Sequence, residues 1–415
     1  MSTTERFFSD EDLAGMVADL KEWPNISCGN EEQELGVSPF VSFYFLYDTR
    51  RHVETSLLMV DIHEEFERLT GKSYLIGTHP DSERPHPYGS KRLPDLREFA
   101  RKVKSGQTFM FNFTDEKNHR SSPTTAGYFW KVKDYMNDRE ISSNKTYSGI
   151  QFFYRWSWWR ENRDAWRRFV LQTIEKLNAE QVYSGFAMAD PLEFGTRAEV
   201  TVWERALAPH FYGLDIDYQF SARGELTSGI RPPTWGFLLS DVWREKLNLG
   251  RDDLKDALHH PHIHIHDLAS GLWIELGEEP SLYPVEEGVP ELPVMLNKIL
   301  KPIRHDHMGL LGFGQWDGDP NERFTNADSL RWMRRFDKNS DWPRAEVRNT
   351  QPPSPFDLSE PTVGELRAKA GDPCPQEGKW ESLDVPSYIR RYEKGEMVAD
   401  LGSSYGLTVW RYLGD

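Results

Sequence analysis

The run from Gln151 to Phe194 constrains the fold more than any other stretch, because three elements of secondary structure can be read in it. It opens with aromatic residues at Phe152–Trp156, a composition that favours a β-strand. Asn162 or Asp164 can cap a helix that follows, whose apolar residues recur at helical spacing up to Leu177. Tyr183–Met188 then predicts a second buried strand. The run is therefore predicted to form a strand-helix-strand unit.

Two interpretations compete for the tryptophans and arginines at the start of this run. Aromatic rings stack on bases and arginines hold phosphates, so Trp158, Trp159 and the arginines near them could bind nucleic acid. Alternatively, the tryptophans pack in the core and the arginines line the solvated side. The chain carries 50 Lys and Arg against 66 Asp and Glu, a formal net charge of −16. Because an acidic protein repels phosphates, we favour packing and expect no direct nucleic-acid partner.

Elsewhere the pattern alternates between helix and strand, with some strand pairs directly adjacent. This order favours an α+β fold class: mixed, largely antiparallel sheets flanked by amphipathic helices. The principal predicted elements are strands at Val41–Tyr47 and Ser56–Asp61, a helix ending at Gly71, a helix within Trp235–Leu247, and strands at Pro261–Asp267 and Gly271–Leu276.

Composition divides the chain into four parts. Residues 1–36 form an acidic N-terminal segment, and residues 37–340 form the α+β domain, which can divide into subdomains at about 37–150 and 151–340. Seven prolines make residues 341–378 a Pro-rich linker or strap. Residues 379–415 regain aromatic and β-branched residues, which predicts a small C-terminal module.

The sequence also indicates where such a protein works. The N-terminus lacks the basic start and apolar stretch of a signal peptide, and no segment has the apolar length of a membrane helix. Cys28 and Cys374 are too few for a disulfide framework. We therefore expect a cytoplasmic protein without a membrane partner.

The histidine-rich segment at residues 259–267 is the strongest catalytic candidate. On a strand, His262, His264 and His266 share one face, and three imidazoles can hold zinc with a position left open for water. This alternative would make the protein a metal-dependent hydrolase. Same-face neighbours on a strand lie ~6.6–7 Å apart, however, and no second ligand motif accompanies them. We favour a partly exposed strand with isoleucines inside, and we predict no cofactor.

Other constellations are incomplete. Asp215 with Asp217, and Asp317 with Asp319, each space two carboxylates by one residue, but neither pair has the downstream glutamate of a calcium loop. His63-Glu64-Glu65 lacks the second histidine of a zinc protease motif. No catalytic set is complete, so we predict that the protein is not an enzyme.

Several segments resemble one known family. They include the Trp-Trp-Arg-x-Asn-Arg sequence at residues 158–163, followed by Tyr183–Met188, Phe211–Asp217, Gly229–Pro232 and Leu330–Asp337. These segments are similar to the TsiV-type family of type VI secretion system immunity proteins, and the similarity runs from about Val37 to Asp337. The tail from Gly378 resembles a module found on other type VI immunity proteins.

The resemblance implies a protein that binds and neutralises a cognate effector toxin without catalysing a reaction. Such a toxin is encoded by the adjacent gene, and relatives are paired with nucleases. A basic nuclease would suit a partner of net charge −16. The predicted partner-binding residues lie in loop-like regions and are all acidic: Glu278, Glu279, Glu286, Glu287, Asp317 and Asp319.

Overall fold

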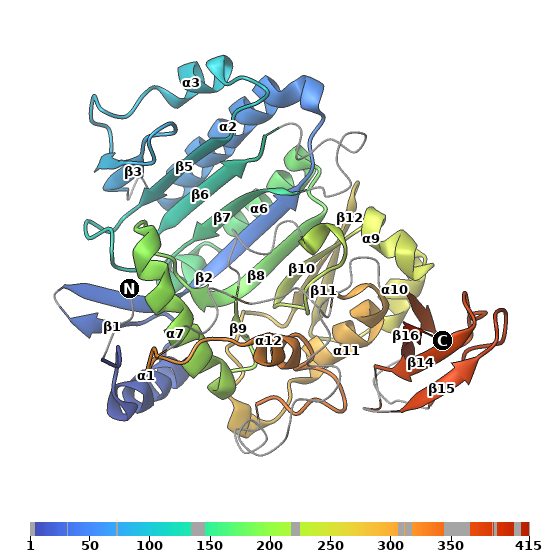
Figure 1. Ribbon diagram of the computed structural model, residues 1–415. Helices are drawn as coiled ribbons and strands as arrows, with labels where there is room; N and C mark the ends of the chain where they lie inside the picture. Colours follow the sequence, from blue (N-terminus) through green and yellow to red (C-terminus); the bar gives the residue numbers. More distant parts are fainter. Residues whose placement is uncertain are drawn as a thin grey trace.

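A computed structural model describes residues 5–30, 32–71, 74–133, 146–216, 225–305, 311, 318–343, 366–383, 385, 388–401 and 408–414. Within these ranges, twelve strands form one large sheet in the order β11-β12-β10-β8-β2-β7-β6-β5-β3-β4, with β1 paired to β2 and β9 to β8 (Figure 1). The strands are β1 (Ser27–Asn30), β2 (Gln33–Phe45), β3 (Ile76–Thr78), β4 (Pro85–Pro87), β5 (Phe109–Thr114), β6 (Ala126–Lys131), β7 (Ser148–Phe153), β8 (Gln181–Met188), β9 (Leu214–Asp215), β10 (Gly236–Ser240), β11 (Ile263–Leu268) and β12 (Gly271–Leu276). Every pairing is antiparallel except that of β8 with β9.

Helices cover both faces of this sheet. The α-helices are α1 (Asp10–Glu22), α2 (His52–Thr70), α3 (Leu96–Lys102), α5 (Trp156–Glu161), α6 (Arg163–Leu177), α7 (Arg197–Leu207), α9 (Asp241–Arg244), α10 (Arg251–Ala257), α11 (Glu291–Leu300) and α12 (Asn326–Met333). Short 3-10 helices are η1 (Thr49–Arg51), η2 (Phe194–Thr196), η3 (Ala208–His210), η4 (Glu225–Thr227), η5 (Glu245–Leu247), η6 (Val285–Glu287) and η7 (Lys301–Ile303). The mixed, largely antiparallel α+β prediction is thus confirmed.

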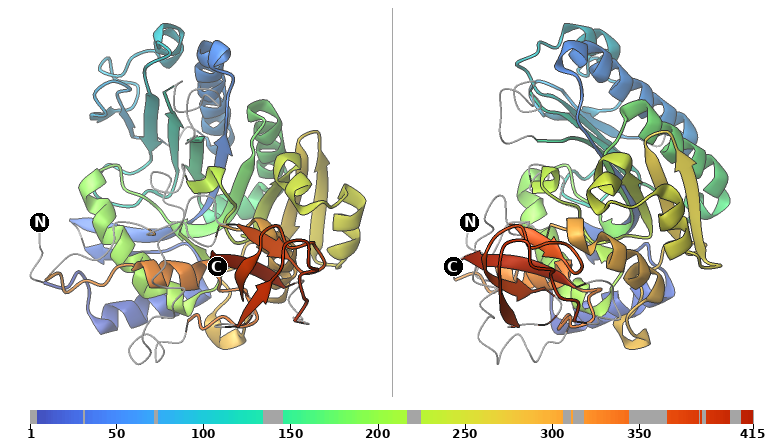
Figure 2. Two further views of the ribbon diagram at one scale, coloured as in Figure 1. Left: turned by 45° about the vertical axis from the view of Figure 1, so that its right-hand side comes forward. Right: turned by 90° about the vertical axis from the view of Figure 1, so that its right-hand side faces the viewer.

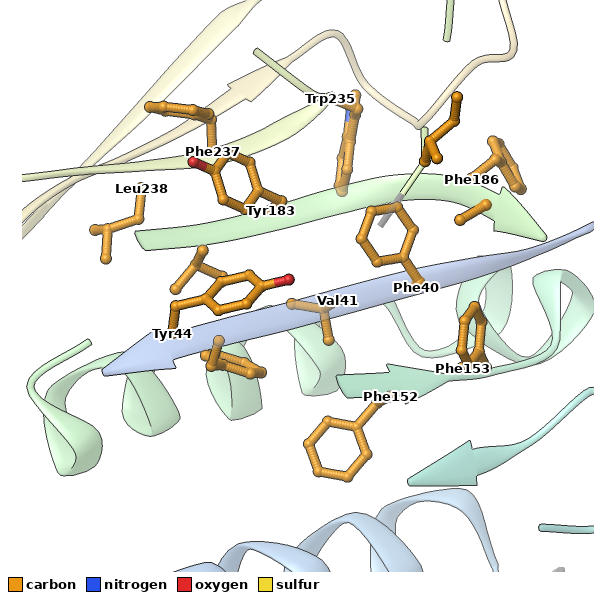
Figure 3. Close-up of a cluster of buried hydrophobic side chains, with 14 of the residues drawn as sticks. Phe40, Val41, Tyr44, Phe152, Phe153, Tyr183, Phe186, Trp235, Phe237 and Leu238 are labelled. Atoms are coloured by element: carbon orange, nitrogen blue, oxygen red, sulfur yellow. The ribbon is translucent and has the colours of Figure 1, made fainter. Parts of the chain in front are cut away.

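The core lies around β2 and its neighbours β7 and β8. From Leu35 to Phe45 every residue of β2 is buried, because both faces of this central strand are covered. Figure 3 shows aromatic side chains of β2, β7 and β8 packed together with Phe237 of β10. On one face, Phe66 of α2 stacks on Phe152 with ring centroids 4.1 Å apart, and Phe169 of α6 lies 5.5 Å from the same ring. The strand-helix-strand run is therefore the centre of the molecule.

The N-terminal segment also belongs to this core. Met16, Val17 and Leu20 of α1 are buried in the same hydrophobic cluster as β2 and β8. Phe8 packs against Trp203 of α7 with ring centroids 3.9 Å apart and the ring planes tilted by 31°. The acidic residues in the first turn of α1 favour its formation, since negative charge stabilises a helix N-terminus. The N-terminal segment, which is acidic in sequence, therefore contains a helix that packs into the core.

Two predicted elements are wrong in type. Ser56–Asp61 was predicted as a strand but lies inside helix α2, which runs to Thr70 and ends, as predicted, at Gly71 with a φ of 86°. Trp235–Leu247 was predicted as a helix, but its first half is strand β10, and helix α9 starts at Asp241. Both errors fall on short, continuous apolar runs, in which periodicity cannot separate a buried strand from a buried helix.

A second sheet lies at the C-terminal end of the chain, beside α11 and α12 (Figure 2). Its order is β13-β16-β14-β15, formed by Arg367–Lys369, Val409–Gly414, Gly378–Ser382 and Ile389–Tyr392. It has its own cluster of buried residues, which includes Trp380, Tyr392 and Trp410. The first strand of this sheet comes from residues that were assigned to the Pro-rich segment by composition.

Candidate partner-binding surface

Only the second half of the histidine segment lies in β11 (Ile263–Leu268), the edge strand next to β12, and His262 precedes it. His264 and His266 lie opposite Glu275 and Trp273 of β12, on the face that α6 covers. His264 Nε2 lies 2.8 Å from the Glu278 carboxylate, whereas His266 Nε2 lies 4.0 Å from Glu275. His262 is exposed, and its backbone N–H donates to His260. The three predicted metal ligands thus have different neighbours.

Glu275, which faces the histidines of β11 from the neighbouring strand, is held by an arginine of α6. Its carboxylate is buried and accepts two hydrogen bonds from Arg167 of α6, at 2.9 and 2.8 Å. Burial lowers the pKa of His266, and the Arg167 guanidinium acts in the same direction while Glu275 opposes it. In the described part of the chain, no group of three or more His, Cys, Asp or Glu side chains is arranged to hold a metal ion. The hydrolase alternative therefore has no assembled donor set in these residues.

Four predicted partner-binding carboxylates lie on one loop, residues 277–288, which we call the acidic loop. Glu278, Glu279, Glu286 and Glu287 are all exposed. Three of them have a basic neighbour: Glu278 has His264, Glu279 accepts from Arg163 at 2.6 Å, and Glu286 pairs with Lys21. Backbone hydrogen bonds anchor the loop at Gly277, Leu282 and Tyr283. The acidic loop is exposed and fixed, but its negative charge is partly offset.

The two remaining predicted residues lie elsewhere. Asp317 is outside the described residues. Asp319 is buried, and its carboxylate accepts a 2.5 Å hydrogen bond from Arg323, whose side chain is equally buried. Burial raises the pKa of Asp319, but hydrogen bonds from Arg323 and Asn321 outweigh that effect and hold it at about 2. Asp319 holds the fold together and is not presented to a partner in this structure.

The paired aspartates Asp215 and Asp217 and the tryptophans Trp158 and Trp159 had also been considered as functional residues. Asp215 forms a buried ion pair with Arg231, while its predicted companion Asp217 is outside the described residues. Trp159 is buried and Trp158 half-buried, and the Arg163 guanidinium lies 4.8 Å from the centre of the Trp159 ring. Trp159 is therefore not available as a platform for stacking bases, and Trp158 is partly packed against the core.

One feature was missed by sequence reasoning: a cavity of about 630 Å³ between α2 and α3. Its lining includes His63, Glu64 and Glu67 of α2 together with Tyr88 and Phe113. His63 and Glu64 had drawn attention only as an incomplete zinc motif. A histidine on the apolar face of a predicted helix was the one indication of the cavity in the sequence. Many histidines at such positions are simply buried in the core, so this pattern does not identify a cavity.

Comparisons with known proteins identify what this fold belongs to. The chain has the fold of the solved structure of "Pseudomonas aeruginosa T6SS protein PA0821", with a TM-score of 0.68 and 20% identity over 84% of this chain and 98% of that one. A family model described as TsiV, type VI immunity for VRR-NUC, matches residues 60–336. The chain belongs to this family of type VI immunity proteins. A search of curated proteins finds no match.

The family assignment confirms the resemblance seen in the sequence. The match ends where expected, near Asp337, but begins at Val60 inside α2, later than Val37. The central strand β2 lies outside the match, yet it pairs with both β7 and β8 within it. Among the described helices, none is long and apolar enough to cross a lipid bilayer.

Proposed function

We propose that the protein binds a VRR-NUC effector and neutralises it by stoichiometric protein–protein interaction, without catalysing a reaction. The effector is encoded by the adjacent gene, and the complex forms in the cytoplasm, where a nuclease would otherwise reach nucleic acid. The observation that carries this proposal is the family match over residues 60–336. The solved structure with the same fold is named as a T6SS protein, which agrees with it.

Charge supports the proposal. A nuclease surface that contacts phosphates is basic, and a net charge of −16 attracts such a surface over long range. Some of the histidines and carboxylates considered as catalytic candidates are held by partners within the fold: His264 lies against Glu278, Asp215 pairs with Arg231, and Asp319 pairs with Arg323. This supports binding over catalysis.

Titration against the toxin tests the proposal. The purified chain is added in steps to the active effector while nuclease activity is followed, and a catalytically inactive effector is used to isolate the complex. We expect inhibition to be complete near a fixed molar ratio, a complex of that composition, and an effector of unchanged mass. Complete inhibition at a small fraction of the effector concentration would indicate an enzyme and contradict the proposal.

We further propose that the acidic loop contributes to binding, mainly through Glu286 and Glu287 of η6. Both are exposed at the end of the loop. Glu286 forms an ion pair with Lys21, and Glu287 is the next residue in the chain. Reversing both charges with Glu286→Lys/Glu287→Lys should weaken effector binding about tenfold at low salt and flatten its dependence on ionic strength.

The matched control is Asp252→Lys/Asp256→Lys, which makes the same change of charge on exposed positions of α10. Isothermal titration at two salt concentrations gives both affinities, and the melting temperature checks that each variant is folded. Equal losses in the two variants would show that only overall charge matters. An unchanged affinity in the loop variant would remove the acidic loop from the interface.

A further inference from the structure

Helices α2 and α6 lie side by side on one face of the large sheet, and a groove opens between them (Figure 2, blue and green helices). Phe66 of α2 packs against Phe169 of α6 with ring centroids 5.6 Å apart, and Lys176 of α6 pairs with Glu65 of α2 at 2.6 Å. These contacts fix the separation of the two helices. The groove has a volume of about 350 Å³, in the range of sites that take a small molecule or one side chain of a partner.

The groove has an apolar floor and a basic rim. Phe169 is buried at the floor, and the half-buried side chains of Leu69 and Ala165 lie beside it. Arg68 of α2 and Arg168 of α6 are exposed and line the same groove from its two helices. A group that enters the groove therefore meets two guanidinium groups above an apolar surface.

Neither of these arginines is occupied within the described part of the chain. There, no hydrogen bond, ion pair or ring contact joins the side chain of Arg68 or Arg168 to another residue. The one carboxylate in the lining, that of Glu65, is already held by Lys176. With Lys176 counted, three cations stand against one carboxylate, a local formal charge of +2 in a chain of −16. The groove is thus a basic site on an acidic protein.

A basic rim above an apolar floor selects an anion on an apolar stem. A guanidinium binds a carboxylate or a phosphate in the same way, through paired N–H donors. A net charge of −16 repels a polyanion such as nucleic acid at long range, which opposes a phosphate backbone as the ligand. A single carboxylate on the surface of a basic protein is not opposed in this way. The charges therefore favour a protein carboxylate.

We propose that the groove between α2 and α6 binds an aspartate or glutamate side chain of the effector. The carboxylate lies between Arg68 and Arg168, and its stem packs against Phe169. The groove adjoins the acidic loop, because α6 also carries Arg163, which pairs with Glu279 of that loop. The effector thus meets opposite charges at two neighbouring sites, which fixes its orientation. This inference rests on the proposed function for its partner, but its recognition chemistry can be tested without the effector.

The first experiment measures affinity for the inactive effector by calorimetry. Arg68→Gln and Arg168→Gln should each weaken binding about tenfold, because each removes a guanidinium from the carboxylate. The sign of the effect is informative, since loss of a positive charge makes the chain more attractive to a basic effector at long range. Arg160→Gln, at an exposed position of α5 outside the groove, removes the same charge and should bind as tightly as the wild type or slightly more tightly. Wild-type affinity in both groove variants would overturn the proposal.

The double variant Arg68→Gln/Arg168→Gln shows whether the two arginines hold the same group. If they share one carboxylate, the second substitution costs less than the first, and the double variant should bind about 10- to 30-fold more weakly than the wild type. A loss of about 100-fold would mean that the two arginines act independently, which contradicts a shared carboxylate. All three variants should melt at the temperature of the wild type, because exposed arginines without an ion-pair partner contribute little to stability. A lowered melting temperature in step with the lost affinity would indicate a structural role instead.

The second experiment needs no effector. Butyrate has the carbon chain of a glutamate side chain, and butyramide is its neutral counterpart. The ¹⁵Nε signals of Arg68 and Arg168 in the full chain are followed by NMR during each titration. We expect saturable shifts of both signals with butyrate, in the millimolar range, and none with butyramide. Absence of a shift with butyrate, or equal shifts with butyramide, would overturn the proposal.

Inorganic phosphate distinguishes the other source of an anion. Binding of phosphate at least about tenfold more tightly than butyrate would assign the groove to a phosphate ligand and contradict a protein carboxylate. Weaker or equal binding of phosphate agrees with the proposal. If the wild type fails to bind the effector at all, the proposed function fails, and the butyrate titration still decides whether the groove selects a carboxylate.

Discussion

Buried arginines explain why the segments that resemble the family are conspicuous in the sequence. Arg304 donates to both Asp337 oxygens at 2.7 and 2.8 Å. Arg335 donates to the Tyr212 carbonyl and lies 3.8 Å from the centre of the Trp332 ring. Burial lowers the pKa of Arg335 to about 9, an effect opposed by Asp215. Trp332, Arg335 and Asp337 belong to the family-like segment Leu330–Asp337, and Tyr212 belongs to Phe211–Asp217, so these parts of the family pattern correspond to buried contacts of the core.

Breaking one such pair should cost much stability. Arg231 donates to Asp215 at 2.5 Å, and both side chains are almost completely buried. Arg231→Met leaves the carboxylate of Asp215 in the core without its guanidinium, so the free energy of unfolding should fall by about 3–5 kcal/mol. Urea denaturation measures the loss. Arg50→Met, which removes an arginine from the exposed pair with Asp48, should leave stability almost unchanged.

His63 predicts a dependence of stability on pH. Its pKa is about 3 in the folded protein and about 6.5 in the unfolded chain, so between these values the unfolded state binds the additional proton. Stability attributable to this residue is complete above pH 6.5 and is lost as the pH falls towards 3. At pH 5 the loss should be about 2 kcal/mol.

The comparison is between wild type and His63→Phe, each unfolded with urea at pH 7 and pH 5. The wild type should lose about 2 kcal/mol more than the variant, because phenylalanine does not titrate. Equal losses in the two proteins would mean that folding does not lower the pKa of His63.

At the scale of elements, α6 is fixed to the sheet by one charged contact as well as by its apolar face. Arg167 reaches the buried Glu275 carboxylate of β12, which also accepts from the indole of Trp273 at 3.0 Å. Trp166, one residue earlier, packs against Trp235 and Trp273. The arginines of this helix therefore differ in role, although they look alike in the sequence.

Arg167→Met should destabilise the protein by about 2 kcal/mol, since it leaves a buried carboxylate with only the indole as donor. The loss is smaller than for a fully buried pair because the Arg167 side chain is 32% exposed. Arg168→Met, on the exposed side of the same helix, is the control. Thermal denaturation of the two variants gives the comparison, and equal melting temperatures would show that Glu275 does not depend on Arg167.

The same helix shows which parts of the fold can be predicted from sequence. Trp166, Phe169, Val170, Ile174 and Leu177 are buried, as their spacing predicted, because the pattern fits only a helix. The strands predicted at Pro261–Asp267 and Gly271–Leu276 are also present, as β11 and β12, which pair with each other. Strand β10 and the start of α2 were missed because their continuous apolar runs fit either structure, and only packing against distant elements decides between them.

Predictions of surface residues were limited by contacts between distant parts of the chain. Glu279 was correctly placed in a loop, but its partner Arg163 is 116 residues away in sequence. Asp319 has the composition of a solvated turn, yet it is buried with Arg323. The cavity joins His63 to Phe113 and Tyr88 across three elements. Local pattern carries no information about such pairings, because they arise only when the whole sheet has formed.

At the scale of the whole molecule, the described residues form two hydrophobic cores that meet at a small junction. The large sheet and its helices share one cluster, and the C-terminal sheet has another. Leu330 of α12, Leu383 and Val409 form a third, separate cluster between them. Arg367 of β13 adds a 2.7 Å hydrogen bond to the Arg304 carbonyl. The Leu330–Leu383–Val409 cluster and this hydrogen bond thus join the C-terminal sheet to the large core among the described residues, and we predict that this junction can be disrupted without unfolding either core.

Leu383→Asp tests this separation, because a carboxylate at the junction must keep its water and so opposes docking. Hydrogen exchange should become about tenfold faster or more in β14 and α12, while β2 and β8 in the large core remain protected. Leu413→Asp is the control, since Leu413 lies on the same small sheet but is 44% exposed, and it should leave exchange unchanged. Faster exchange throughout the large sheet would show instead that the two cores unfold as one cooperative unit and that the junction is part of it.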